Sequence, residues 1–287
     1  MAEIFDIEWK KVEQIIHIAL AEDAVLDDVT TNALIPANQE GKAQLTSKRE
    51  GVLAGMGVAT LMFHKVDTSL KVEQLIAEGS RVQYGDRVAT IEGKIASILR
   101  AERVALNFLQ HLSGIATETA RYVEAVSGTR AQITDTRKTT PGLRLLEKYA
   151  VRLGGGRNHR YNLADAILIK DNHLKALQSQ GMSLEEIIKK ARQHSAPALK
   201  VEVEVETVEV AQEALSAGAD IIMLDNMNLA AMRQVVQLVQ GQALLEASGG
   251  ITLDNVRLVA QTGVDLISVG ALTHSAKALD ISLDLEP

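Results

Sequence analysis

The sequence contains no cysteine, which excludes disulfide bonds and metal sites built from thiolates. Aromatic residues make up only 3% of the chain, and no run of 18 apolar residues could form a transmembrane helix. Acidic residues outnumber basic ones by 37 to 30, and the net charge of −7 disfavours a nucleic-acid partner or a membrane-binding face. Residues Met1–Asp6 lack the basic and apolar regions of a targeting signal. We therefore expect a cytoplasmic protein that binds small molecules.

The chain is long enough for two domains with buried cores, since it has 287 residues of which 46% are apolar. Its first part has a helical pattern over 9–21 and short alternating runs, punctuated by glycine, over 42–93. A second helical pattern over 95–126, interrupted at Ser113-Gly114, connects this part to the rest. We place the domain boundary between residues 112 and 113.

Beyond the boundary, short apolar runs alternate with helical patterns. Six apolar runs are visible, around residues 132–133, 167–169, 201–203, 221–224, 243–245 and 266–269. Strands that alternate with helices every 20 to 35 residues, roughly, predict a parallel sheet that closes or nearly closes into a barrel. A doubly wound open sheet is the competing fold, but no glycine-rich dinucleotide motif or Walker A sequence supports it.

Polar residues follow each apolar run, where a barrel gathers its catalytic groups. The strand ends carry Thr134–Lys138, Lys170–His173, Glu202 with Glu204 and Glu206, Asp225-Asn226, Ala247–Gly250 and Val269–Ala271. Such residues can also cap the next helix, and we favour this interpretation for Asn172, Asn226 and Thr252. For Asp225 two interpretations are equally balanced, a helix cap or a ligand of a divalent metal or of sugar hydroxyls.

Segment 200–206 alternates strictly, with its valines on one face and Lys200 and three glutamates on the other. A half-exposed edge strand explains this pattern as well as a barrel strand does. In a barrel, however, the glutamates would face the interior, where a carboxylate is costly unless it is paired or bound to a cation. At least one of these glutamates should therefore have a partner or a ligand.

Positive charge is concentrated over residues 137–160, where seven basic residues and one acidic residue give +6. Arg144, Lys148 and Arg152 have the spacing of a solvated helix face. The remaining candidates in loops are Arg137, Lys138, His159 and Arg160. Because arginine forms two parallel hydrogen bonds with a carboxylate or phosphate, the loop residues suit a ligand with several negative charges.

Glycines at the last two strand ends add a candidate phosphate site. Ser248-Gly249-Gly250 and Gly270-Ala271 stand where barrels commonly hold phosphate on backbone N–H groups. Three consecutive glycines at 154–156 indicate a further flexible loop beside the basic segment.

These motifs resemble those of the quinolinate phosphoribosyltransferases, also called carboxylating nicotinate-nucleotide pyrophosphorylases. The motifs that carry the resemblance are 136–144 (TRKTTPGLR), 154–160 (GGGRNHR), 169–173 (IKDNH), 224–226 (LDN), 247–251 (ASGGI) and 268–275 (SVGALTHS). Segments 21–31 and 102–109 also resemble the first domain of that family. The resemblance covers nearly the whole chain, with no departure at a motif position.

The resemblance implies an α/β protein with an N-terminal α/β sandwich domain, residues 1–112, followed by an incomplete, open α/β barrel, residues 113–272. Residues 273–287 would return to the first domain. It also implies a homodimer or higher even oligomer, in which the sandwich domain of one subunit covers the barrel mouth of the other. Arg103 would then act across the interface.

The implied activity is phosphoribosyl transfer from phosphoribosyl pyrophosphate to quinolinate with decarboxylation, in NAD biosynthesis. The implied substrate-binding residues are Arg103, Thr136, Arg137, Lys138, His159, Arg160, Lys170, Glu204, Asp225, Ser248, Gly249, Gly250, Val269, Gly270 and Ala271. The implied catalytic residues are Lys170, Glu204 and Asp225. Glu204 and Asp225 would lie on the ribose and Mg²⁺ side, with the metal held mainly through the substrate. Of the three glutamates in 200–206, the spacing to Asp225 favours Glu204.

Two rival functions fit part of this pattern. One is a paralogous enzyme of the same fold that acts on a different aromatic acid or is associated with molybdenum uptake. The other is a phosphosugar-binding or scaffold protein without turnover, for which we would expect an arginine or lysine to be missing from the motifs. None is missing, so the sequence favours the enzyme.

Overall fold

The computed structural model describes residues 7–286, so the segment Met1–Asp6 considered above lies outside the described residues. The chain forms two compact units. The first comprises Met1–Ala120, Thr139–Gly155 and Ala271–Pro287, and the second comprises Arg121–Lys138 and Gly156–Gly270. The sequence-based boundary between 112 and 113 falls inside the long helix α4 (Ile95–Ala125).

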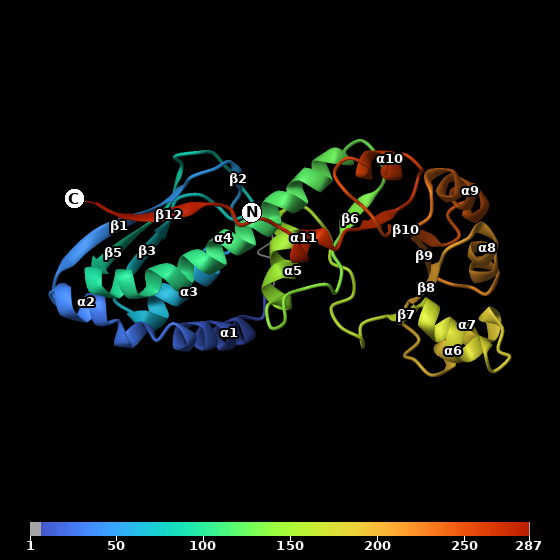
Figure 1. The fold of residues 1–287 in the computed structure, drawn as a ribbon, viewed down its shortest axis with the longest axis horizontal. Helices are drawn as coiled ribbons and strands as arrows, with labels where there is room; N and C mark the ends of the chain where they lie inside the picture. Colours follow the sequence, from blue (N-terminus) through green and yellow to red (C-terminus); the bar gives the residue numbers. More distant parts are fainter. Residues whose placement is uncertain (1–6, 287) are drawn as a thin grey trace. The chain divides into compact units, whose positions relative to one another are not determined.

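The first unit is built on a four-stranded antiparallel sheet in the order β12-β1-β5-β3 (Figure 1). Its strands are β1 (Glu40–Ser47), β3 (Lys71–Gln74), β5 (Arg87–Lys94) and β12 (Ile281–Leu285), and β2 (Gly51–Val52) pairs separately with β4 (Arg81–Val82). The C-terminal strand β12 pairs with β1, so the end of the chain returns to this unit.

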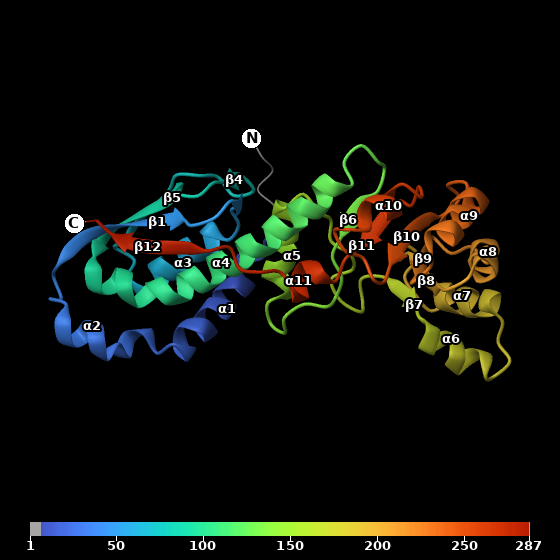
Figure 2. The ribbon, with the colours of Figure 1, turned by 45° about the horizontal axis from the view of Figure 1, so that its top comes forward.

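Helices complete the sandwich. They are α1 (Trp9–Glu22), the 3₁₀ helix η1 (Val25–Asp27), α2 (Val29–Leu34), α3 (Met56–Val66), the greater part of α4, α5 (Arg144–Leu153) and α11 (Ala271–His274). Figures 1 and 2 show α3 and the first part of α4 beside the four-stranded sheet, with α1 and α2 beyond them. This layering confirms the predicted α/β sandwich.

The interruption predicted at Ser113-Gly114 is wrong, because α4 continues through both residues. Close packing explains the glycine instead: a Cβ on Gly114 would lie 2.3 Å from the carbonyl oxygen of Lys277. Glycine inside a helix therefore marks a close approach of the backbone here rather than a helix end.

The second unit holds a six-stranded parallel sheet in the order β6-β11-β10-β9-β8-β7. The strands are β6 (Gln132–Thr134), β7 (Ile167–Ile169), β8 (Val201–Val205), β9 (Ile221–Asp225), β10 (Leu244–Ser248) and β11 (Leu266–Ser268). From β7 to β11 each strand lies beside the next one in the sequence, as in an α/β barrel, whereas a doubly wound sheet reverses its order at a switch point. Within the described residues β6 and β7 are the end strands and do not pair with each other, which confirms the open barrel.

The helices of the second unit are α6 (Asp171–Gln178), α7 (Leu184–Gln193), α8 (Val208–Ser216), α9 (Leu229–Val239) and α10 (Val256–Ala260). Helices α6, α9 and α10 have Lys170, Asn228 and Asn255 at their N-cap positions. The capping interpretation of Asn172, Asn226 and Thr252 is therefore wrong. No helix in the described part of the chain is long and apolar enough to cross a membrane.

Strand β8 is paired on both sides, with β7 and β9, so the edge-strand interpretation is wrong. Its three valines are buried, and so is Glu202, which alternates with them. Since alternate residues of a strand point to opposite faces, the glutamates face the interior of the open barrel. Both glutamates within the strand have partners, as described below.

Candidate active site

A cavity of about 650 Å³ opens among the carboxyl ends of the parallel strands of the second unit. The sequence-predicted residues that line it are Thr136, Arg137, Lys138, His159, Arg160, Lys170, Glu204, Asp225, Ser248, Gly249 and Gly250. Parallel pairing brings them together, because Ser248 aligns with Asp225, and Glu204 with Met223, on neighbouring strands. Leu168, Met223, Glu246 and Ser268 also line the cavity and were not predicted as site residues. Asn226 lines it too, although the sequence predicts a helix cap there.

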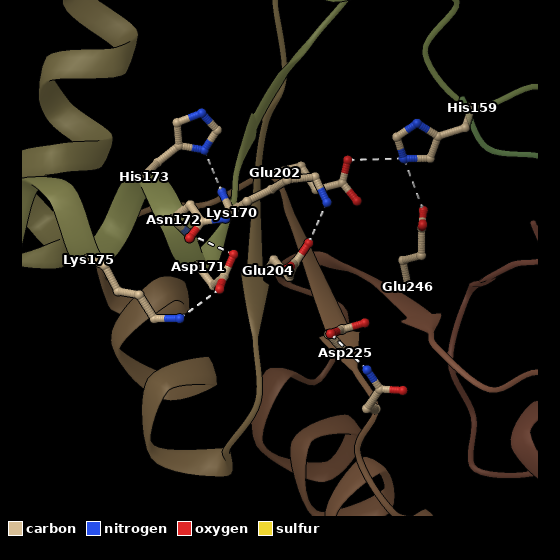
Figure 3. A network of polar contacts seen from close by, with 11 residues as sticks. His159, Lys170, Asp171, Asn172, His173, Lys175, Glu202, Glu204, Asp225 and Glu246 are labelled. Carbon is tan, nitrogen blue, oxygen red and sulfur yellow. Dashed lines mark hydrogen bonds and ion pairs between the residues drawn. The ribbon is translucent and has the colours of Figure 1, made fainter. Parts of the chain in front are cut away.

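One wall of the cavity carries a lysine–glutamate pair beside a second carboxylate (Figure 3). The ammonium of Lys170 donates to Glu204 Oε2 at 2.7 Å, and the Asn226 amide donates to Asp225 Oδ2 at 3.0 Å. Burial, and then the negative charge of Glu204, raise the pKa of Asp225. Asp225 is not a helix cap, since Asn228 caps α9 through its side chain. These two carboxylates would be stabilised by positive charge on a ligand.

Guanidinium groups supply the opposite charge in the same cavity. The Nε of Arg137 is buried and has no hydrogen-bond partner among the described residues. Arg160 donates to the carbonyl of Ala166 at 3.2 Å, and burial, followed by the nearby charge of Arg137, lowers the pKa of Arg160. Partly buried like charges with an unused donor are stabilised when an anion binds between them. The geometry therefore fits a carboxylate or phosphate ligand.

The basic segment 137–160 is divided between the two units. Arg144, Lys148 and Arg152 belong to α5 in the first unit, where Lys148 is buried, so the solvated-face interpretation is wrong for this residue. The neighbouring Glu147 is also buried and accepts hydrogen bonds from His111 Nε2 and from the Thr140 N–H, each at 3.0 Å. This face of α5 packs internally rather than contacting solvent.

The loop after β10 depends on glycine for its shape. Gly249 and Gly250 have φ of +89° and +63°, in the left-handed region that other residues adopt at a cost. A Cβ on Gly249 would lie 2.2 Å from Asn226 Oδ1, so the side chain of Asn226 occupies the space beside this loop. The loop lines the cavity at the position where the sequence predicts a phosphate.

Replacing Gly249 with alanine should lower the free energy of unfolding by roughly 2 to 4 kcal/mol, because backbone strain and the clash with Asn226 add together. Chemical denaturation measures this loss. Gly241→Ala is the matched control, since Gly241 has φ of +79° but nothing within 4 Å of the added Cβ. Equal losses in the two variants would mean that the contact with Asn226 has no energetic effect.

His159 joins two buried glutamates in the barrel interior (Figure 3). Its Nε2 lies 3.1 Å from Glu202 Oε2 and 3.5 Å from Glu246 Oε2. Glu246 is fully buried, and neither of its carboxylate oxygens has a hydrogen-bond partner among the described residues. Burial, and then the charge of Glu202, raise the pKa of Glu246 to about 7. The sequence signal that could have identified Glu246 as a site residue is its position as the one carboxylate inside the apolar run 243–247.

The raised pKa of Glu246 predicts a pH-dependent stability. The folded state binds this proton up to about pH 7, whereas the unfolded chain releases it near the ordinary value of 4.5. The stabilisation is therefore complete below the unfolded value and is lost as the pH rises through the folded one. Relative to wild type, Glu246→Gln should gain up to about 3 kcal/mol between pH 5 and pH 8. Denaturation across this range measures the gain, and a constant difference would contradict the assignment.

Comparison with known proteins decides the family. The model of the quinolinate phosphoribosyl transferase N-terminal domain matches residues 28–113, and that of the C-terminal domain matches residues 115–284. The chain belongs to this family. It is 43% identical to the nicotinate-nucleotide pyrophosphorylase [carboxylating] of Mycobacterium leprae, over 98% of this chain and 99% of the relative. A probable enzyme of the same name from Bacillus subtilis is 42% identical, over 96% and 93% of the two chains.

Solved structures agree with this membership. The crystal structure of NadC from Streptococcus pyogenes superimposes with a TM-score of 0.93 at 45% identity, and 98% of each chain is covered. The nicotinate-nucleotide pyrophosphorylase of Francisella tularensis gives a TM-score of 0.93 at 36% identity, over 100% of both chains. The family's combination of a sandwich and an open barrel is thus the fold of this chain.

Four residues implied by the family resemblance do not line the cavity in this chain. Val269 is buried and its N–H donates to the Thr134 carbonyl at 2.9 Å. Gly270 and Ala271 stand where the second unit ends and the last part of the first unit begins. Arg103 lies on α4 in the first unit, with 62% of its side chain exposed. The structure leaves the binding roles of all four as predictions.

Proposed function

We propose that this chain transfers the phosphoribosyl group of phosphoribosyl pyrophosphate to quinolinate and removes one carboxylate as carbon dioxide, as a step of NAD biosynthesis. The observation that carries the proposal is the charge arrangement of one cavity. Arg137, Lys138 and Arg160 line it together with Glu204 and Asp225. Cationic groups suit the carboxylates and phosphates of the substrates, and the carboxylates suit a sugar that becomes positively charged in the transition state.

Each substrate has a matching set of residues. The two carboxylates of quinolinate pair with Arg137, Lys138 and Arg160. In support of this pairing, the buried Nε of Arg137 has no hydrogen-bond partner among the described residues. The 5′-phosphate lies at the loop Ser248–Gly250 and the ribose beside Glu204 and Asp225. Holding both anionic substrates in one cavity also aligns the pyridine nitrogen with C1 of the ribose.

The reaction then proceeds in two steps. The nitrogen forms a bond to C1 while the bond from C1 to the pyrophosphate oxygen breaks, and pyrophosphate leaves with that electron pair. Glu204 and Asp225 stabilise the positive charge on the sugar during this displacement. The positively charged ring next accepts the electrons left on C2 when carbon dioxide departs. Lys170 or a water molecule delivers a proton to C2, which yields nicotinate mononucleotide.

The carboxylates also fit Mg²⁺. Glu204 and Asp225 offer the oxygen ligands that Mg²⁺ prefers, but one oxygen of each already accepts a hydrogen bond, from Lys170 and Asn226 respectively. Two carboxylates are too few for a site made of protein alone, so the ion is held chiefly through the phosphates of the substrate. When bound, it neutralises charge on the leaving pyrophosphate.

We further propose a homodimer, or a higher even oligomer, in which Arg103 of one subunit completes the cavity of the other. The support is its exposed guanidinium on a helix of the first unit, while the cavity belongs to the second. Arg103→Ala and Arg137→Ala should each abolish most of the activity, and mixed dimers of the two should regain part of it. Mixed dimers as inactive as their parents would show that each site takes Arg103 and Arg137 from the same subunit, which would contradict the proposal.

A cytoplasmic location remains our expectation. The plant relatives include proteins named as mitochondrial and chloroplastic, so location varies among similar chains. Fractionation of the source cells, with the chain followed by antibody, tests it.

The proposed activity separates from its rivals by product analysis. The purified chain with Mg²⁺, phosphoribosyl pyrophosphate and quinolinate should form nicotinate mononucleotide, and nicotinate should not replace quinolinate. Turnover of nicotinate alone would favour an enzyme for another aromatic acid. Tight binding of phosphoribosyl pyrophosphate without turnover would favour the non-catalytic rival.

A further inference from the structure

The group of His159, Glu202 and Glu246 borders the active-site cavity and brings two buried carboxylates to one imidazole nitrogen. His159, Arg160 and Glu246 line the active-site cavity and also a second cavity of about 580 Å³ at the amino ends of the strands. His159 and Glu246 therefore lie between two spaces, and Glu202 lines the second of them. Whether this group can bind a ligand directly depends on which ring nitrogens of His159 are free of contacts within the protein.

Both ring nitrogens of His159 have partners within the protein. The backbone N–H of Arg160 donates to Nδ1 at 2.8 Å, so Nδ1 is the unprotonated nitrogen. The hydrogen of a neutral ring then sits on Nε2, which faces Glu202 at 3.1 Å and Glu246 at 3.5 Å. In this arrangement a substrate can bind the imidazole through a nitrogen only if one of these contacts breaks.

The same contacts argue against a metal ion in this group, although its ligand atoms all lie within 4.8 Å of one another. A metal on Nε2 requires that nitrogen to be unprotonated and the hydrogen to move to Nδ1. The Arg160 N–H would then face an N–H instead of an acceptor. The hydrogen-bond pattern favours a proton at this position over a metal.

The segment that carries His159 is fixed at its other side by β6 and the residue after it. The fully buried Asp135 accepts the N–H of His159 at 2.8 Å and the Asn158 amide at 2.6 Å. The Arg157 N–H donates to the carbonyl oxygen of Ile133 at 2.8 Å. Glu202 contacts the ring from the barrel interior, with Glu246 at 3.5 Å from the same nitrogen, while Asp135 holds the backbone. Arg160, next in the sequence, emerges from a segment fixed at both the backbone and the ring.

We propose that Glu202 and Glu246 are positioning residues for quinolinate binding, which act through His159 to fix Arg160 in the cavity. The proposal rests on the proposed function, because it assigns Arg160 to a carboxylate of that substrate. Glu202 is the acceptor for the Nε2–H, and Glu246, the more deeply buried carboxyl, limits the charge of the group by retaining a proton.

A set of four variants tests the positioning role by steady-state kinetics. Glu202→Leu removes the acceptor and should raise KM for quinolinate about tenfold, with KM for phosphoribosyl pyrophosphate changed less than about twofold. Glu202→Gln keeps an oxygen acceptor and should stay within about threefold of wild type. In an Arg160→Ala background, Glu202→Leu should add less than about twofold, since a residue that acts through Arg160 has nothing left to position.

Several results would overturn the proposal. One is a full tenfold effect of Glu202→Leu in the Arg160→Ala background, and another is loss of thermal stability with no change in KM for quinolinate. A third is a metal ion that copurifies with the chain at one equivalent and is absent from Glu246→Gln, because the group would then hold a metal instead of a proton.

Nitrogen NMR of the His159 ring gives a result independent of activity: it should show a protonated Nε2 and an acceptor Nδ1. A chain that shows this ring state without turning over quinolinate would contradict the proposed function and not the hydrogen-bond arrangement.

Discussion

Arg137→Ala should raise KM for quinolinate about 100-fold, because two charge-assisted hydrogen bonds, each contributing roughly 1.5 kcal/mol or more, are lost. Arg160→Ala should have an effect of similar size. Both arginines line the cavity, and the buried Nε of Arg137 has no hydrogen-bond partner among the described residues. Steady-state kinetics with quinolinate as the varied substrate measure the change.

The same substitutions should lower the melting temperature little, since burial beside a like charge already disfavours the ionised Arg160 in the absence of substrate. Arg233→Ala is the matched control, because Arg233 is an exposed residue of α9 that does not line the cavity. Its KM should equal that of wild type. Parallel losses of stability and of substrate affinity in Arg137→Ala would instead assign this arginine to the fold.

Replacing Glu204 with glutamine should lower kcat about 100-fold at saturating substrates, as should Asp225→Asn. Electrostatic groups aimed at charge that develops in a transition state contribute about 3 kcal/mol in comparable sites. Each variant keeps the shape of the side chain and removes its charge. The expected loss is in kcat more than in KM, because the sugar is positively charged only during the displacement.

Glu206→Gln is the control within the same segment, and its kcat should stay near that of wild type. The sequence offers Glu202, Glu204 and Glu206 on one face of the alternating pattern, and the structure separates them. Glu202 is buried beside His159, Glu204 lines the cavity next to Lys170, and Glu206 is exposed beyond the strand. A large loss in Glu206→Gln with none in Glu204→Gln would reverse the assignment.

The barrel strands were predictable because each is a short apolar run followed by polar residues. This pattern alone predicts that Lys170, Glu204, Asp225 and Ser248 lie at the same edge of the sheet. Parallel pairing then fixes their neighbourhood, since strands aligned in register end together. The repeats predict a closed or nearly closed barrel, and the family resemblance implies the open form.

The features that the sequence pattern did not predict depend on contacts between residues far apart in the chain. Gly114 suggested a helix break, but the carbonyl of Lys277 packs against it. Lys148 has the spacing of an exposed helix face and is buried. Glu246 lies within an apolar run, and the pattern does not indicate that it pairs across the barrel with His159, a loop residue. Periodicity reports which face a residue occupies, and it carries no information about which remote segment covers that face.

The stoichiometry of carbon dioxide and pyrophosphate release tests the central claim most directly. Quinolinate labelled in the carboxylate on C2 is incubated with the chain, Mg²⁺ and phosphoribosyl pyrophosphate, and both products are followed over time. We predict equal molar release of labelled carbon dioxide and pyrophosphate, with neither formed when phosphoribosyl pyrophosphate is omitted. Pyrophosphate released while the label stays in the nucleotide, or carbon dioxide released without phosphoribosyl pyrophosphate, would contradict the account.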